Sequence, residues 1–223
     1  MRHYRERKKP TLSGRRFRQT EIQVNDIRPV KQKLRAESKL YRKGLSEQEK
    51  KTLDSKISNR FFNTWQYRSC KVLLSYVSTE IEVDTRAIIS RALSDGKRVA
   101  VPRCIDNTRL MDFYFIKSFD DLESGFMGVL EPVPEKCEKM TDFSEGLCIV
   151  PALMFDVRGY RLGYGKGYYD RFLSNFCGET LGICYNSCIK EKLPHGKFDK
   201  CVERIITQSK MITANDAKGG GAK

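Results

Sequence analysis

Short, continuous apolar runs separated by helix-like segments are the feature that most constrains the fold. The runs lie at residues 71–77, 98–102, 112–116 and 147–151. An uninterrupted apolar run of this length is typical of a strand buried on both faces, as in a parallel sheet. At 223 residues the chain suits one sizeable core. We therefore predict a single α/β domain with a mainly parallel sheet flanked by helices, a Rossmann-like three-layer arrangement.

Helix signals fill the spaces between these runs. Ser46 followed by Glu49 forms a capping box, and Gly44 and Gly96 are typical helix stops. Asp84 or Thr85 is the expected cap of a third helix. The predicted elements are helices over residues 29–43, 46–62, 84–96 and 168–176, and further strands near 180–185 and 204–208.

Of the net charge of +14, residues 1–25 carry +6 and the rest of the chain +8. Residues 1–25 hold eight Lys and Arg against two acidic residues and lack periodic hydrophobicity. We expect residues 1–25 to be a basic, disordered arm, 26–212 the folded domain and 213–223 a flexible tail. The remaining positive charge suits a polyanion, either nucleic acid or a phosphate-rich small molecule.

Compartment signals indicate a cytoplasmic protein with no membrane partner. The longest apolar stretch, residues 147–155, is interrupted by Pro151 and is too short to cross a bilayer. No secretory leader opens the sequence. Eight scattered cysteines without a CxxC pair are typical of free thiols in a reducing compartment.

The most informative segment, residues 151–171, leaves a predicted strand and enters a predicted helix. Its glycines are Gly159, Gly163, Gly165 and Gly167. Closely spaced glycines let backbone N–H groups converge on an anion, and Arg161 and Lys166 add positive charge. With Asp170 nearby, the pattern indicates a phosphate cradle beside a metal-binding carboxylate. A Walker A loop is excluded because Gly, not Ser or Thr, follows Lys166. On spacing alone, an ordinary glycine-rich connector stays open.

The string RLGYGKGYYDRFL, preceded by PALMFD, closely resembles the signature of the 5-formyltetrahydrofolate cyclo-ligase family. Four further elements occur in the family's order, so the resemblance covers residues 27 to about 209. They are KxxLR at 31–35, the acidic segment 76–85, Gly128 with Glu131-Pro132, and Leu193-Pro194 with Asp199 before 205–207.

The resemblance implies ATP- and Mg²⁺-dependent cyclisation of 5-formyltetrahydrofolate to 5,10-methenyltetrahydrofolate, with release of ADP and phosphate. The family's reaction passes through a phosphorylated formyl group. Such chemistry asks the protein for positioning and charge neutralisation, which agrees with a chain that holds only two histidines, His3 and His195. The implied partners are ATP and the folate, with or without a polyglutamate tail. We expect a monomer that binds no nucleic acid.

The resemblance also implies site residues. Those implied to bind ATP are Lys31, Arg35, Arg161, Leu162, Gly163, Tyr164, Gly165, Lys166, Gly167, Tyr168 and Tyr169. Those implied to bind the folate are Glu82, Asp84, Tyr164, Gly165, Lys166, Gly167 and Tyr168. Arg161, Lys166 and Tyr168 are the expected catalytic residues, and Asp170 and Asp199 the expected Mg²⁺ ligands.

Simpler readings of these residues remain open. Lys31 and Arg35 could be a solvated helix face, Asp84 only a helix cap, and Asp170 a partner of Arg171. Two other functions are also open: a basic RNA-associated protein, and a family member that binds folate or nucleotide without turnover. The sequence lacks the aromatic pattern of an RNP motif and a zinc knuckle.

Overall fold

The structure is a computed structural model that describes residues 26–125 and 128–214. The predicted arm, residues 1–25, lies outside the described residues, as does most of the predicted tail. Strand β13 (Met211–Thr213) pairs with β12 and so takes in Thr213, the first residue assigned to that tail. In the described part of the chain, no helix combines the length and apolar character needed to cross a membrane.

The described residues form an eight-stranded sheet in the order β13-β12-β10-β7-β1-β2-β3-β6. Strands β12, β10, β7, β1 and β2 run parallel. At the edges, β13 pairs antiparallel with β12, β3 pairs antiparallel with β2, and β6 pairs antiparallel with β3. This confirms the predicted mainly parallel sheet. The bounds are β1 Val72–Ser75, β2 Arg98–Cys104, β3 Met111–Ile116, β6 Glu138–Lys139, β7 Leu147–Val150, β10 Glu179–Ile183 and β12 Arg204–Ile206.

Five helices accompany the sheet among the described residues. They are α1 Arg28–Lys43, α2 Glu47–Phe62, α3 Trp65–Ser69, α4 Arg86–Ser94 and α5 Tyr168–Phe172, with short 3₁₀ turns η1 Phe119–Asp121 and η3 Asn186–Cys188. The first two match the prediction, and the capping box of Ser46 and Glu49 begins α2. Thr85 begins α4 without a side-chain cap: its hydroxyl donates to the Tyr76 carbonyl, while Asp84 accepts the Arg86 N–H.

Helix α5 ends four residues earlier than predicted. The Ser174 hydroxyl donates to the Asp170 carbonyl at 2.8 Å. Serine side chains that take an i−4 carbonyl compete with the backbone N–H for it. The Ser174 N–H then turns to the Arg171 carbonyl, and the Asn175 N–H turns to that of Phe172, so the chain tightens and leaves the helix.

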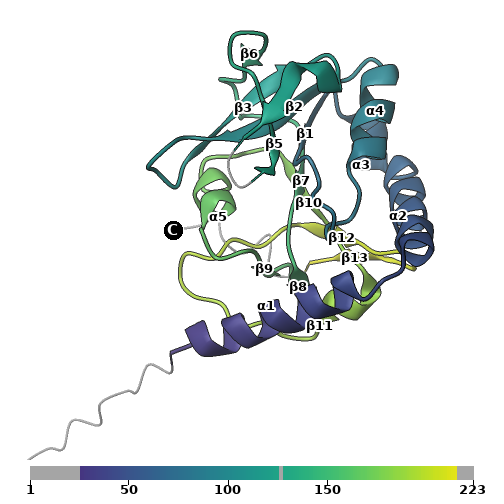
Figure 1. The fold of residues 1–223 in the computed structure, drawn as a ribbon, viewed down its shortest axis with the longest axis vertical. Helices are drawn as coiled ribbons and strands as arrows, with labels where there is room; N and C mark the ends of the chain where they lie inside the picture. The colour runs from purple at the N-terminus through teal and green to yellow at the C-terminus, as the bar shows by residue number, and fades with distance from the viewer. Residues whose placement is uncertain (1–25, 126–127, 215–223) are drawn as a thin grey trace, which may run out of the picture.

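The helices lie on both faces of the sheet (Figure 1). From β1 the chain passes through α4 to β2, and from β7 through α5 to β10, which lies on the opposite side. Right-handed crossovers in opposite directions place α4 and α5 on opposite faces, as Figure 1 shows. The three-layer prediction is therefore confirmed. Because strand order reverses between β1 and β7, a ligand crevice is expected at their carboxyl ends.

A second, three-stranded sheet takes two of its strands from the glycine-rich segment 151–171 and the third from residues 189–190. Its strands are β8 Met154–Asp156, β9 Arg161–Leu162 and β11 Ile189–Lys190, and a separate pair joins β4 Leu122–Ser124 to β5 Leu130–Pro132. Helix α1 crosses beside this small sheet (Figure 1). There the Ser38 hydroxyl donates to the Leu153 carbonyl at 2.7 Å. Helix α1 and the small sheet together frame the carboxyl ends of β1 and β7.

Candidate functional site

The glycine-rich loop, residues 163–167, follows β9 and lies against α1. Arg35 Nε donates to the Gly163 carbonyl at 2.8 Å. A Cβ added at Gly165 would stand 3.3 Å from the Arg35 guanidinium, so that helix and loop approach closely. The structure thus places Arg35 as a support of the loop.

The backbone of this loop presents unpaired donors. Gly165 and Gly167 have φ values of +101° and +77°, a region that favours glycine. Within the described residues, the N–H groups of residues 164–167 donate no hydrogen bond. Consecutive N–H groups in such a turn form a concavity suited to an anion. The helix dipole adds little here, because α5 has only five residues.

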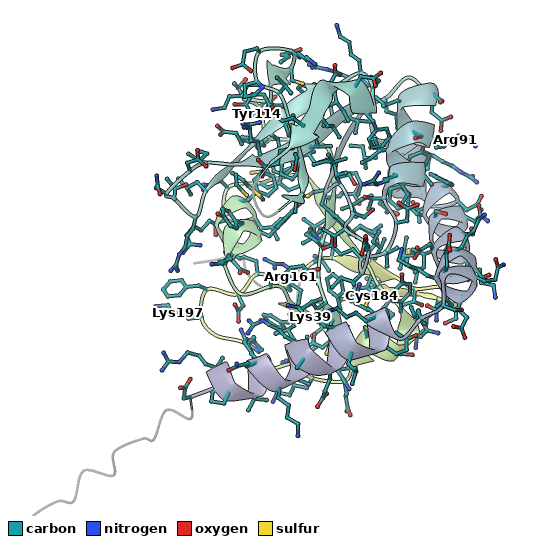
Figure 2. All side chains as sticks on the ribbon, in the orientation of Figure 1. Lys39, Arg91, Tyr114, Arg161, Cys184 and Lys197 are labelled. Carbon is teal, nitrogen blue, oxygen red and sulfur yellow. The ribbon has the colours of Figure 1, made fainter. Side chains whose placement is uncertain are left out.

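Two ion pairs join the residues implied for ATP to those implied for the metal. Lys31 Nζ lies 2.5 Å from Asp199 Oδ2, and Arg161 Nη2 lies 2.8 Å from Asp170 Oδ1. Figure 2 shows Arg161 between α1 and α5. Its side chain is only 5% exposed. Four groups distant in sequence thus form a set of two cations and two carboxylates.

Electrostatics agree with this pairing. Burial would raise the pKa of Asp199, but hydrogen bonds from Lys31 and the Gly196 N–H, and the charges of Lys31 and Arg161, hold it below its usual value. Burial lowers the pKa of the Arg161 guanidinium, and the charge of Asp170 opposes that shift. The Asp199 carboxylate therefore stays ionised near neutral pH.

The two carboxylates fit a magnesium ion. Asp170 Oδ1 also accepts the Lys200 N–H, and Asp199 Oδ2 also accepts the Gly196 N–H. Among the described residues, the second oxygen of each carboxylate accepts no hydrogen bond. No group of three metal-binding side chains occurs in that part of the chain. Mg²⁺ often takes only one or two carboxylates and completes its shell with phosphate oxygens and water.

Two buried polar atoms next to this set have no partner among the described residues: Arg161 Nε and Tyr169 Oη. The Arg161 guanidinium carbon lies 5.9 Å from the Tyr169 ring centroid. Buried polar groups are nearly always satisfied in proteins. Their position indicates that a ligand or water oxygen belongs there.

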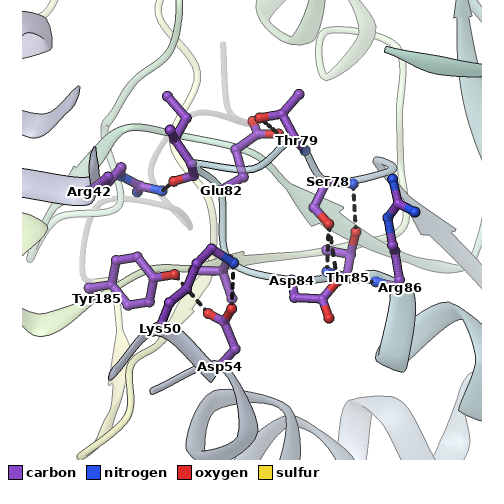
Figure 3. Close-up of polar contacts among 12 residues, drawn as sticks. Arg42, Lys50, Asp54, Ser78, Thr79, Glu82, Asp84, Thr85, Arg86 and Tyr185 are labelled. Atoms are coloured by element: carbon purple, nitrogen blue, oxygen red, sulfur yellow. Dashed lines mark hydrogen bonds and ion pairs between the residues drawn. The ribbon is translucent and has the colours of Figure 1, made fainter. Parts of the chain in front are cut away.

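The loop's other side meets a buried carboxylate. Glu82, 7% exposed, accepts the N–H and hydroxyl of Thr79, both at 2.9 Å (Figure 3). Burial, followed by the charge of Glu82, raises the pKa values of Tyr164 and Tyr76. The pKa of Tyr169 is raised mainly by burial, and the charge of Glu82 contributes. The charge of Glu82 therefore acts on all three tyrosines.

Asp84 lies apart from this cluster. Its Oδ1 accepts the Arg86 N–H at 2.8 Å and the Ser78 hydroxyl at 3.2 Å (Figure 3). Because the chain turns at residues 80–82, the side chains of Glu82 and Asp84 have different neighbours. The structure brings only Glu82 to the tyrosines.

The remaining implied residues have distinct places. Tyr168 faces the β2–β3 connection, where its hydroxyl donates to the Thr108 carbonyl at 3.4 Å. Lys166 is exposed at the loop tip. Asp170 pairs with Arg161, whereas Arg171 Nη1 donates to the Gly167 carbonyl at 2.9 Å.

Sequence reasoning missed two cations on α1. Lys39 lies 5.4 Å from the Tyr164 ring centroid and continues the i, i+4 row of Lys31 and Arg35, a spacing that could have revealed it. Arg42 is buried and donates to the carbonyls of residues 81, 152 and 153 at 2.9–3.0 Å. Nothing in the local sequence marked it.

Comparisons with known proteins agree with this arrangement. The model of the 5-formyltetrahydrofolate cyclo-ligase family matches residues 27–208. The chain is 28% identical over 203 residues to a probable 5-formyltetrahydrofolate cyclo-ligase of Caenorhabditis elegans, covering 85% of this chain and 98% of the relative. It is 30% identical over 162 residues to one of Schizosaccharomyces pombe, covering 66% and 79%.

A solved structure gives the same result at the level of the fold. The NMR structure of 5,10-methenyltetrahydrofolate synthetase of Aquifex aeolicus superposes with a TM-score of 0.72 at 28% identity, covering 87% of this chain and 96% of that one. The resemblance drawn from the loop motif is confirmed. The chain belongs to the 5-formyltetrahydrofolate cyclo-ligase family.

Proposed function

We propose that this protein catalyses the ATP-dependent cyclisation of 5-formyltetrahydrofolate to 5,10-methenyltetrahydrofolate, with Mg²⁺ as cofactor. The observation that carries the proposal is that one loop faces two kinds of site. Its unpaired N–H groups follow β9, whose Arg161 pairs with Asp170, an arrangement that suits a metal-bound triphosphate. Its Tyr164 lies beside Glu82, which suits the N–H groups of a pterin.

The chemistry requires activation of a formamide, a poor electrophile because nitrogen donates into the carbonyl. The formyl oxygen attacks the γ-phosphorus of ATP, and ADP leaves. The folate N10 then attacks the formyl carbon and loses its proton. The carbon–oxygen bond breaks, so phosphate departs with the formyl oxygen and the five-membered ring closes.

The chain's own residues would hold the reacting groups. Lys31 and Arg161 would neutralise phosphate oxygens, Asp170 and Asp199 would hold Mg²⁺, and Glu82 would orient the pterin. Mg²⁺, when bound, neutralises charge on the phosphates. With Arg161, Lys166 and Tyr168 are the proposed catalytic residues, as the family resemblance implies. Positioning and electrostatic stabilisation supply most of the acceleration in such transfers.

The ion pairs suggest how the substrate enters. In the free protein each carboxylate is neutralised by a cation of the ATP set. Phosphate oxygens would pair with Lys31 and Arg161 in place of the carboxylates, and the released carboxylates would bind the metal. Nucleotide and metal should therefore bind with positive coupling, each raising the affinity for the other.

The direct test mixes purified protein with 5-formyltetrahydrofolate, ATP and Mg²⁺ and follows the near-ultraviolet absorbance of the methenyl product. Product should form only when all three are present, and EDTA should abolish it. Lack of product with a folded protein that retards RNA at moderate salt would contradict the proposal and favour an RNA-associated role.

Two lesser points complete the proposal. We place the enzyme in the cytoplasm as a monomer; the eight free cysteines support a reducing compartment. Fractionation and sedimentation would test both.

A further inference from the structure

The turn between β8 and β9 centres on Asp156, a carboxylate with no exposed surface. Its Oδ1 accepts the N–H groups of Arg158 and Tyr160, each at 3.0 Å. Its Oδ2 accepts the Leu193 N–H at 2.9 Å and Arg158 Nη2 at 3.2 Å. Three of these bonds are local, while the bond to Leu193 crosses 37 residues of sequence.

That long-range bond is one of several ties between the same two segments. The Val157 N–H donates to the Lys190 carbonyl at 3.2 Å, and the Val202 N–H donates to the Gly159 carbonyl at 2.9 Å. A Cβ at Gly159 would stand only 2.2 Å from the Val202 carbonyl oxygen, so the approach requires glycine. The turn thus holds the segment 190–202 at both of its ends.

A fourth tie lies in the middle of the segment. The Tyr160 ring stacks on the His195 ring, with centroids 3.7 Å apart and planes inclined by 7°. Asp199 follows four residues after His195, and Arg161 follows directly after Tyr160. The turn therefore connects Arg161, from one ion pair, with the segment that carries Asp199, from the other.

We propose that Asp156 is a positioning residue for the metal site: its carboxylate fixes the segment carrying Asp199 against the strand carrying Arg161. This rests on the proposed function, in which Asp199 binds Mg²⁺. No hydrogen bond joins Asp156 to Asp199, so the effect passes through the backbone at Leu193 and through the turn that carries Tyr160, whose ring stacks on His195. A carboxylate is required because Asp156 accepts donors at both oxygens.

Asp156→Asn tests this role with little change of shape. An amide offers one accepting oxygen, so its NH₂ group must face either the Leu193 N–H or the N–H groups of the turn. Two donors in contact repel each other and leave a buried N–H unsatisfied. We expect the segment 190–202 to shift and the Asp199 oxygen to leave its position for the metal.

The readout is calorimetric binding of a non-hydrolysable ATP analogue at a series of Mg²⁺ concentrations. In Asp156→Asn the Mg²⁺ concentration for half-maximal binding should rise about tenfold, while affinity for the metal-free nucleotide should change less than twofold. His195→Ala removes the stacked ring from a half-buried position and should raise the Mg²⁺ concentration for half-maximal binding two- to threefold. This second variant keeps the test usable if Asp156→Asn does not fold.

Asp54→Asn is the matched control. Asp54 is also buried and accepts the Tyr185 hydroxyl at 2.7 Å, but it lies on α2. It should lower the melting temperature and leave the Mg²⁺ dependence unchanged. A folded Asp156→Asn protein, or His195→Ala protein, with the Mg²⁺ dependence of the original would overturn the inference. If the affinity of the original protein for the nucleotide does not depend on Mg²⁺, the proposed function itself fails.

Discussion

Among single residues, Asp170 and Asp199 matter most to the proposed metal site. Each uses one carboxylate oxygen in an ion pair and keeps the other without a hydrogen bond among the described residues. The motif identified both residues, but not their pairing. Arg161 meets Asp170 across a loop of irregular backbone, and Lys31 meets Asp199 across 168 residues, contacts that only the folded chain defines.

Asp170→Asn should leave the fold intact and slow turnover. The amide keeps the side-chain shape and an acceptor for Arg161, but lacks the charge that a metal ion needs. A charge-stabilising contact of this kind is worth roughly 3–4 kcal/mol, or about two to three decades in rate. Steady-state kinetics across a Mg²⁺ series should show partial recovery at high Mg²⁺.

The control for that variant is Asp112→Asn. Asp112 forms an ion pair of similar length, 2.6 Å to Lys139, at the far edge of the sheet. The Asp112→Asn variant should turn over at the rate of the original protein. Near-normal turnover of folded Asp170→Asn at limiting Mg²⁺ would remove Asp170 from the metal site.

Substitutions of Glu82 and Asp84 should have different effects on the KM for the folate. Glu82→Gln removes the charge beside three tyrosines and should raise the KM for the folate at least tenfold, because a charged acceptor makes stronger hydrogen bonds than an amide. Asp84→Asn should change stability slightly and leave that KM within about twofold. An unaltered folate KM in Glu82→Gln would place the pterin elsewhere.

At the scale of elements, the regular parts were predictable and the irregular parts were not. Strands β1, β2, β3 and β7 and helices α1 and α2 follow from apolar runs, a capping box and a glycine stop. The small sheet of β8, β9 and β11 was not foreseen, because strands of two or three residues carry too little periodicity. Helix α5 ends early, where the N–H groups of Ser174 and Asn175 donate to carbonyls three residues back, a change of pattern that leaves no periodic signal.

Gly165→Ala tests the loop as an element. At a φ of +101° an added Cβ is strained, and it would also stand 3.3 Å from the Arg35 guanidinium. We expect the loop to shift and the KM for ATP to rise about tenfold or more, measured at saturating folate. Loss of stability alone should be about 1–2 kcal/mol.

Gly96→Ala supplies the comparison. Gly96 has a similar positive φ of +75°, with open space around its Cβ position, at the end of α4. It should lose similar stability, measured by denaturant unfolding, and keep its KM. An equal KM for ATP in the two variants would show that the conformation of the loop does not matter to nucleotide binding.

At the scale of the whole molecule, the fold explains why two substrates can meet. The reversal of strand order between β1 and β7 opens the sheet at their carboxyl ends. Glu82 follows β1, and the glycine-rich loop follows β7 by way of the small sheet. Helix α1 then covers both with its row of cations. The architecture was predictable; the way α1 lies across it depends on contacts of Ser38 and Arg42 with backbone carbonyls, which leave no mark in sequence.

In the proposed mechanism this site transfers the γ-phosphoryl group of ATP to the formyl oxygen. The most direct measurement starts from 5-formyltetrahydrofolate labelled with ¹⁸O in the formyl group and determines, by mass spectrometry, where the label goes after complete turnover with ATP and Mg²⁺. The mechanism predicts one ¹⁸O atom in each phosphate released, because the formyl oxygen departs with phosphorus. Unlabelled phosphate, with the label found in water, would exclude phosphorylation of the formyl oxygen.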